Sequence, residues 1–262
     1  MDNLHFSEDL HISAMVQIGR FNTEINLEKL ASKLEINKNI LYIEYGPLIN
    51  KGENNKRLSK KKKENKKYFY NQLTIHIFNE LKNNKRVNAK IFNNGRVQMT
   101  GINSDEIGKT TMNLINLELN KFKNDKDIFI NFEDDTIQEV GNLETVLINS
   151  DFDIKSSVNR EALHRQIVKS NYLSSYEPCN YPGVNIKYYF NPLKNNNGIC
   201  NCETPCNGKG KMNECKKVTI VVFKSGKIII TGGRCKNHIQ IAYEFITDFI
   251  EKNKEIVLVR NQ

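Results

Sequence analysis

The sequence predicts an α+β protein made of two pseudo-symmetric halves, chiefly because one motif occurs in it twice. Residues 91–101 (IFNNGRVQMTG) and 222–232 (VFKSGKIIITG) share a phenylalanine, a turn glycine, a basic residue and a closing Thr-Gly. Segments 25–30 and 158–163 also match, and equivalent residues lie 131 apart in the first pair and 133 apart in the second. We therefore expect two related halves that form one curved antiparallel sheet, a saddle, with helices on its convex face.

Each half is expected to follow the order β-α-β-β-β-α. In the first half a strand over 12–18 precedes a helix that Asn26 caps by accepting from free backbone amides. Segments 40–48 and 68–78 are rich in β-branched and aromatic residues and, with the repeated hairpin, supply the other strands. Ser104 then caps a helix whose apolar residues recur every three or four positions.

The second half repeats this order. Strands are expected near 146–154 and 184–190, with a helix from Asn159 between them. After the second hairpin, apolar residues over 239–250 fall on one side of a C-terminal helix.

The domain boundaries follow from shifts in composition. We expect a first repeat over 1–123 with a Lys-rich insert at about 49–67, a polar linker over 124–143, and a second repeat over 144–262 with a Cys-rich insert at about 195–217. The Lys-rich run cannot pack against apolar residues and is expected to be a solvated loop, with non-specific DNA binding and nuclear import as alternative roles.

The overall charge favours a polyanionic partner. The chain has a formal net charge of +9 and a pI near 9.1. It contains no run of apolar residues long enough to span a membrane, and its polar, acidic N-terminus does not resemble a secretory signal. We expect an intracellular protein with reduced cysteines.

Alternation along the repeated hairpin divides its side chains between two faces. Phe223, Ile229 and Thr231 share one side of the sheet, while Ile228 and Ile230 point to the other. If helices cover the second side, the first side exposes apolar groups that need a binding partner. The equivalent residues of the first half are Phe92, Gln98 and Thr100.

These features resemble the TATA-box-binding protein family, most closely its divergent members encoded by large DNA viruses. The duplicated hairpin is one support. The other is the segment 174–183 (SSYEPCNYPG), which is similar to the family's Ser-Ser-Tyr-Glu-Pro-Glu-Leu-Phe-Pro-Gly segment. The resemblance implies a saddle that binds the minor groove of AT-rich promoter DNA, inserts apolar side chains between bases and kinks the duplex.

The resemblance also implies roles for individual residues. Phe92 and Phe223 match intercalating phenylalanines, Tyr181 matches a third such position, and Phe69 and Leu41 are both candidates for the fourth. The residues that match positions lining the groove are Gln98, Thr100, Ile229 and Thr231. The residues that match basic positions near phosphates are Arg96, Lys187, Lys227 and Arg234.

Some positions depart from the family pattern. Ala14 and Ser150 stand where the family has two central asparagines, although Asn149 is adjacent to the second. Gln98 replaces a small apolar residue, and Lys90 also falls at a position that faces DNA. We therefore expect the fold to be kept and the strict preference for TATA sequences to be relaxed.

The implied protein partner is a factor resembling transcription factor IIB, or the RNA polymerase machinery. Glu177 is the retained acidic residue of the segment that contacts this partner in the family, whereas Cys179 and Asn180 replace two others. The protein is expected to be a monomer. Its site of action is expected to be the host nucleus, a cytoplasmic viral replication site or the virion.

Four cysteines cluster in the second insert, at Cys200, Cys202, Cys206 and Cys215. Four thiolates over so short a segment are expected to hold a structural zinc ion, which would stabilise a loop that has no core. The spacing is not the usual pair of Cys-x2-Cys motifs, so free or redox-active thiols and disulfides are the alternatives.

The sequence also allows two other functions. An accessory domain of a nucleic-acid enzyme is disfavoured because the histidines are scattered and the acidic run 133–135 falls in the linker. An adaptor that has lost strong DNA binding is suggested by the missing asparagines. The sequence favours a non-enzymatic transcription factor over both of these alternatives.

Overall fold

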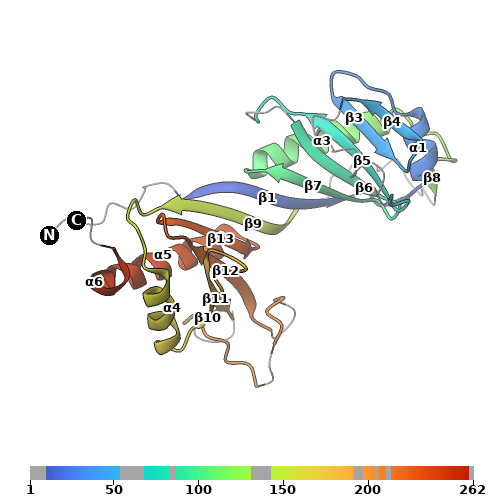
Figure 1. Cartoon of the computed structure of the whole chain (residues 1–262). Coiled ribbons are helices and arrows are strands. Elements are labelled where there is room, and N and C mark those ends of the chain that lie inside the picture. The colour runs from blue at the N-terminus through green and yellow to red at the C-terminus, as the bar shows by residue number, and fades with distance from the viewer. Residues whose placement is uncertain are drawn as a thin grey trace. The chain divides into compact units, whose positions relative to one another are not determined.

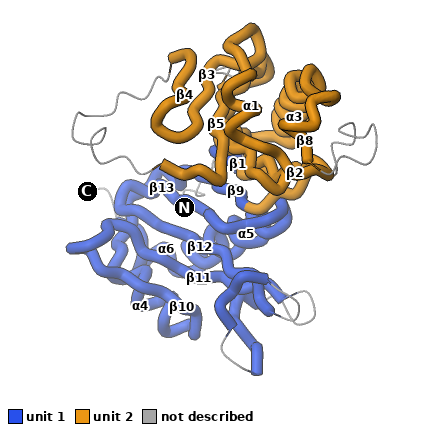
Figure 2. Tube along the Cα trace, turned by 90° about the vertical axis from the view of Figure 1, so that its right-hand side faces the viewer, with its two compact units in different colours: residues 1–14, 147–262 blue, residues 15–146 orange. Residues whose placement is uncertain are grey.

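The computed structural model describes residues 10–53, 68–82, 86–130, 143–191, 197–203, 206–210 and 214–259. The chain divides into two compact units: unit 1 comprises Met1–Ala14 and Leu147–Gln262, and unit 2 comprises Met15–Val146 (Figure 2). The Lys56–Lys67 run and the acidic run 133–135 lie outside the described residues.

Unit 2 contains an antiparallel sheet with helices packed on one face (Figure 1). Its strand order is β1-β7-β6-β5-β3-β4, and α1 packs on β3 and β5 while α3 packs on β5 and β7. A small second sheet pairs β2 with β8, so part of the expected linker is ordered against the unit. The bounds are β1 His11–Arg20, β2 Glu24–Ile25, α1 Leu27–Lys33, β3 Ile40–Tyr45, β4 Ile49–Gly52, β5 Gln72–Phe78, β6 Arg86–Phe92, β7 Arg96–Ile102, α3 Asp105–Asn120 and β8 Phe129–Ile130.

Unit 1 is built on the same plan. Its strand order is β10-β11-β12-β13-β9, with α5 packed on β12 and β13 and α4 packed on β10 and β11. The bounds are β9 Glu144–Asp153, α4 Arg160–Lys169, β10 Leu173–Ser175, β11 Val184–Phe190, β12 Lys216–Val222, β13 Lys227–Gly233, α5 Lys236–Lys252 and α6 Lys254–Val257. Within the described residues, no helix is long and apolar enough to cross a membrane.

The helix caps predicted at Asn26 and Ser104 are confirmed, and the structure adds a cap at Asn159. The side chain of Asn26 accepts from the amide of Lys29, and that of Asn159 accepts from the amide of Ala162. The side chain of Ser104 caps α3 in the same way. Each cap satisfies a backbone N–H that has no partner inside its helix, which fixes where the helix begins.

The repeated hairpin owes its glycine to backbone geometry. Gly95 and Gly226 have φ angles of +75° and +88°, a region that residues with a Cβ rarely adopt. A Cβ would also lie 2.2 Å from the carbonyl oxygen of Phe21 at the first turn and 2.3 Å from that of Ser156 at the second. The two hairpins therefore dock on equivalent backbone segments, which explains why both copies carry glycine.

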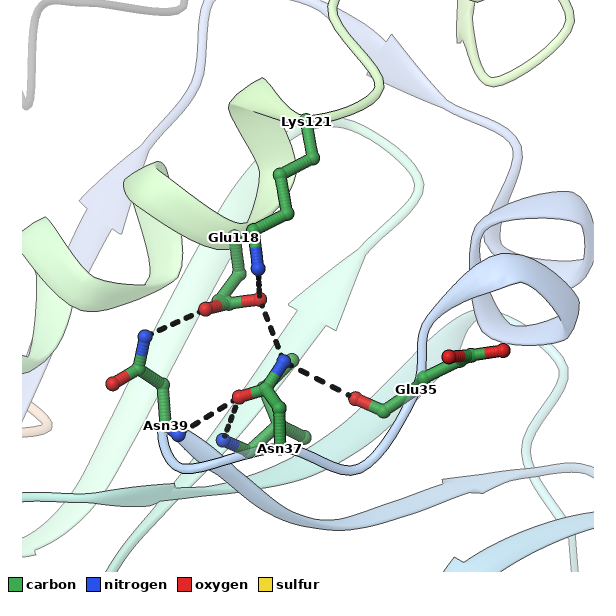
Figure 3. Close-up of polar contacts among 6 residues, drawn as sticks. Glu35, Asn37, Asn39, Glu118 and Lys121 are labelled. Carbon is green, nitrogen blue, oxygen red and sulfur yellow. Dashed lines mark hydrogen bonds and ion pairs between the residues drawn. The ribbon is translucent and has the colours of Figure 1, made fainter.

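A buried carboxylate ties α3 to the start of β3 on the helix side of unit 2 (Figure 3). Glu118 is only 3% exposed, and it accepts from the side-chain amides of Asn39 at 2.6 Å and Asn37 at 2.9 Å. Lys121 forms an ion pair with it at 2.5 Å. Burial raises the pKa of Glu118, but the bonds from Lys121, Asn39 and Asn37 outweigh this effect and hold the pKa below its usual value.

Burial alternates along the strands as the sequence predicts. In β13, Ile228 and Ile230 are fully buried whereas Ile229 and Thr231 are half-buried. In β7, Val97 and Met99 are buried whereas Gln98 and Thr100 are half-buried. In each unit, therefore, one face of the sheet is covered by helices and the other is not, and we call this second face the open face.

Candidate nucleic-acid interface

The open face of unit 1 contains an apolar hollow of about 980 Å³. Tyr181 and Phe223 both line it, with ring centroids 6.0 Å apart and planes inclined by 62°. Gly183 lies against both rings, since a Cβ there would be 3.0 Å from Tyr181 and 3.2 Å from Phe223. Both rings are accessible, with Phe223 half-buried and Tyr181 40% exposed. The hollow is lined in addition by Asn149, Asp151, Val221, Ile229 and Thr231, among others.

The loop that carries Tyr181 is held by its own contacts. The amides of Asn180 and Tyr181 donate to the carbonyl of Glu177 at 3.0 and 2.9 Å. Arg160, at the start of α4, donates to the carbonyl of Pro182, and its guanidinium lies 5.4 Å from the centre of the Tyr176 ring. The carboxylate of Glu177 is exposed and accepts from the Asn180 side chain at 3.0 Å. Tyr181 is thus presented on a fixed turn.

Strand register locates the equivalent aromatic residue in unit 2. In unit 1 the ladder pairs Val184 with Val222, so its continuation places Gly183 opposite Phe223, two residues after Tyr181. In unit 2, Gln72 pairs with Phe92, and the residue two positions before Gln72 is Tyr70. Tyr70, rather than Phe69 or Leu41, therefore occupies the position that matches Tyr181.

The surroundings of Tyr70 agree with this assignment. Tyr70 is 65% exposed, and its ring meets that of Tyr45 edge-on at 6.3 Å. Phe69 is 60% exposed, one position out of register. Leu41 is the extra residue of a bulge in β3, between Ile40 and Tyr42, which pair with Ile77 and His76. These partners lie at the end of β5 opposite to the Phe92 pair, so Leu41 is not brought to Phe92.

The register also shows which central polar residue of unit 1 lies on the open face. Asn149 lies on the open face, where Thr231 donates to its side-chain oxygen at 2.5 Å. Ser150 is fully buried on the other side, and its hydroxyl donates to the carbonyl of His11 at 2.8 Å. Asn149, not Ser150, is therefore placed to meet a ligand. Ala14, which the sequence predicts at the other asparagine position, is half-buried in β1.

Cations accompany the apolar residues on both open faces. Lys187 donates to the Thr219 hydroxyl at 3.0 Å, and burial together with nearby Lys217 lowers its pKa. In unit 2, Lys90 lies 3.4 Å from the side-chain oxygen of Gln72, between Thr74 and Gln98 across the sheet. Arg96 and Lys227 are exposed immediately after the two hairpin turns. Arg234 is exposed after β13, and its guanidinium donates to Gly210 at 3.3 Å.

The four cysteines of the second insert converge beside β12. Their sulfur atoms all lie within 4.8 Å of one another, and Cys215 is buried while the other three are half-buried. The Sγ atoms of Cys200 and Cys206 are 3.4 Å apart, and those of Cys202 and Cys215 are 3.5 Å apart. These separations are too long for disulfide bonds, whose sulfurs lie about 2.05 Å apart. Cys179 and Cys235 are exposed and outside the cluster.

The protonation of the cluster depends on the charges within it. A hydrogen bond from the backbone amide of Cys202 lowers the pKa of Cys200 to about 7. Burial and hydrogen bonds with the neighbouring cysteines raise the pKa of Cys215 to about 12. Four thiolates this close repel one another unless a cation lies between them. The cluster thus has the donor set and the spacing to bind a metal ion.

An antiparallel sheet with helices on one face, present in two similar units, defines the fold class of the TATA-binding proteins. The structure of Methanococcus jannaschii TBP is similar to this chain with a TM-score of 0.54 at 19% sequence identity, covering 93% of this chain and 99% of that one. The predicted fold is therefore confirmed.

Sequence comparison identifies the family of the chain. A family described as transcription factor TFIID (or TATA-binding protein, TBP) matches residues 148–253. A "TATA-box-binding protein-like" protein of Acanthamoeba polyphaga mimivirus is 34% identical over 208 residues, which is 72% of this chain and 50% of that protein. The chain thus spans about half the length of this relative. It belongs to the TATA-binding protein family, whose members are transcription factors and not enzymes.

Proposed function

We propose that this chain is a transcription initiation factor that binds promoter DNA in the minor groove, through the open faces of its two units, and bends it. The observation that carries the proposal is the aromatic pair of unit 1: Tyr181 on its fixed loop and Phe223 at the hairpin turn are both accessible and line an apolar hollow. Phe92 and Tyr70 occupy the matching register in unit 2. Such rings can enter partly unstacked base steps, and kinking the duplex allows more of its surface to be contacted.

The rest of the open face suits the same ligand. A·T pairs offer only acceptors in the minor groove, so a surface of apolar and hydroxyl groups such as Ile229 and Thr231 reads them by shape more than by direct contacts. The exposed Arg96 and Lys227 supply attraction to phosphates that depends on salt. Arg234 and Lys187 extend this charge on unit 1.

A duplex with altered grooves tests the proposal. Replacing A·T pairs by inosine·cytosine pairs leaves the minor groove nearly unchanged but gives the major groove the pattern of G·C pairs. Fluorescence anisotropy should give similar affinities for an A·T duplex and its inosine·cytosine counterpart. A large loss of affinity on this replacement would show that the protein reads the major groove, and absence of binding to any duplex would overturn the proposal.

We propose further that the Tyr176–Tyr181 loop recruits a factor resembling transcription factor IIB. Glu177 is exposed there and is held by Asn180, so its charge is available at a fixed position. Glu177→Arg should abolish a ternary complex with the factor and DNA while the affinity for DNA alone is kept. Glu161→Arg on α4 is a matched control, because Glu161 is also exposed. An unchanged ternary complex with Glu177→Arg would refute this role.

We propose that the cysteine cluster holds zinc. With Zn–S bonds of about 2.3 Å, tetrahedral geometry separates the sulfurs by about 3.8 Å. Three of the six sulfur separations, at 3.4, 3.5 and 3.8 Å, are close to this value, and all six lie within 4.8 Å. Zinc would link the insert to the start of β12 at Cys215.

Elemental analysis of the purified protein tests the metal. It should find about one zinc ion per chain, and Cys206→Ser with Cys215→Ser should remove it. The double variant Cys179→Ser, Cys235→Ser is the control, because both thiols are exposed and lie outside the cluster. Wild-type protein without stoichiometric metal after purification under reducing conditions would contradict the proposal.

A further inference from the structure

The two units differ along one strand of the open face. Ile229 of β13 pairs with Asp151 of β9, whereas the matching Gln98 of β7 pairs with Ile18 of β1. The same comparison applies to the neighbouring pairs in the two ladders. Unit 1 carries polar or acidic residues where unit 2 carries apolar or basic ones: Asn149 against Val16, Asp151 against Ile18, and Asp153 against Arg20.

Asp151 is the most accessible of the three residues in unit 1. It is exposed, it lines the hollow, and among the described residues no hydrogen bond or ion pair engages its carboxylate. Asp153 is half-buried, and its carboxylate accepts from the amide of Lys155 at 2.7 Å. Asn149 uses its side-chain oxygen to accept a hydrogen bond from Thr231, which leaves the donors of its NH₂ group for a ligand. A donor and a charged acceptor thus lie two residues apart on one strand.

This pairing is unsuited to an unbroken A·T minor groove. Adenine N3 and thymine O2 are both acceptors, and a carboxylate facing them is repelled and loses its water without gaining a bond. Guanine alone adds a donor to the minor groove, its 2-amino group, while the G·C pair keeps acceptors beside it. Asp151 and Asn149 together match that arrangement.

We infer that Asp151 accepts a hydrogen bond from the 2-amino group of guanine, so that the part of the DNA site facing unit 1 contains a G·C pair. The inference rests on the proposed binding in the minor groove and names the base pair that unit 1 selects. Unit 2, with Ile18 at the matching position, remains suited to A·T pairs. A pseudo-symmetric protein with this difference binds an asymmetric site in one orientation, which would set the direction of transcription.

Modified bases isolate the 2-amino group from every other feature of the base pair. A·T, diaminopurine·thymine, inosine·cytosine and G·C pairs are placed in turn at each position of an A·T-rich duplex. Diaminopurine adds the amino group to an A·T pair, and inosine removes it from a G·C pair. At one or two positions in one half of the site, duplexes with the amino group should bind the protein about tenfold or more tightly than duplexes without it.

Exchange variants assign the effect to a residue. Asp151→Ile places the unit 2 residue in unit 1 and should abolish the preference and strengthen binding to the A·T duplex, because it removes the charge that faces the acceptors of the A·T pairs. Asp151→Ser serves the same purpose with a small polar side chain, should isoleucine disturb folding. Ile18→Asp should create a second preferred position in the other half of the site.

The outcomes separate this inference from the function on which it rests. Wild-type binding that shows no preference for the amino group at any position overturns the inference alone, as does a preference that survives in both Asp151 variants. Failure of the wild type to bind any duplex overturns the proposed function, and the inference with it.

Discussion

Replacing Phe92 and Phe223 together by alanine removes one ring from each open face. Stacking of an aromatic side chain on a base contributes about 1–3 kcal/mol, so the double variant should lose about 2–6 kcal/mol of binding free energy. Each 1.4 kcal/mol is a factor of ten, so the dissociation constant should rise roughly 30-fold to 20,000-fold. Phe223 also gives up its contact with Tyr181 at 6.0 Å, which can cost about 0.5–1.5 kcal/mol of folding stability.

Anisotropy titration of a labelled A·T-rich duplex measures this loss, and thermal unfolding followed by circular dichroism checks the fold. Both rings are only half-buried, so the free energy of unfolding should fall by less than it does for a core Phe→Ala substitution, which costs about 3–5 kcal/mol. The matched control is Leu117→Ala with Val168→Ala, which truncates apolar residues that are 56% and 49% exposed on the helix side of the two units. The reasoning is refuted if the phenylalanine variant stays folded and binds as tightly as the control.

Four further predictions follow from particular contacts. Tyr70→Ala should weaken binding by about 1–3 kcal/mol, and more than Phe69→Ala does in the same titration, because only Tyr70 is in register with Phe92. Lys227→Ala should reduce the slope of log affinity against log salt concentration by about 1, and an unchanged slope would show that Lys227 does not contact a phosphate. Glu118→Gln should destabilise unit 2 at neutral pH by about 1–3 kcal/mol in chemical denaturation. Because the folded-state pKa of Glu118 lies below 4.5, its contribution is present above that pH and the difference from wild type should shrink as the pH falls through the lowered pKa; a constant difference would contradict the assignment. Gly108→Ala should also destabilise, by about 1–2 kcal/mol, because the new Cβ would lie 1.8 Å from the side-chain oxygen of buried Gln17; a gain in stability would show that Gln17 can move away.

The repeated elements were predictable because their signals are local. Asn26 and Asn159 cap their helices, and glycine at both hairpin turns meets a backbone demand that a short sequence motif reveals. Alternation along β13 separated Ile228 from Ile229 correctly, because side chains in a strand alternate with a period of two.

The positions that the sequence misplaced depend on register, which is a property of two strands. A shift of one residue moves a side chain to the opposite face, and this shift separates buried Ser150 from accessible Asn149. Phe69 likewise precedes Tyr70 by one residue, and only the register shows that Tyr70 is the one that matches Tyr181. The internal repeat offered the missing signal, because aligning Phe92 with Phe223 and counting back along the paired strand leads to Tyr70 and Tyr181.

The acidic residues of the open face were missed for another reason. Asp151 belongs to no recognisable motif, and its meaning emerges only when β9 is compared with β1 pair by pair. The cysteines were the reverse case. Their sequence spacing was irregular, yet the fold brings all four sulfurs within 4.8 Å of one another.

The central claim is that the open faces bend a duplex by inserting aromatic side chains into its minor groove. Fluorescence energy transfer between dyes at the two ends of a short A·T-rich duplex tests it most directly. Saturating wild-type protein should raise the transfer efficiency, and the Phe92→Ala, Phe223→Ala variant should fail to do so even at concentrations that saturate the duplex. Wild-type protein that binds the duplex tightly and leaves the distance between its ends unchanged would contradict the account.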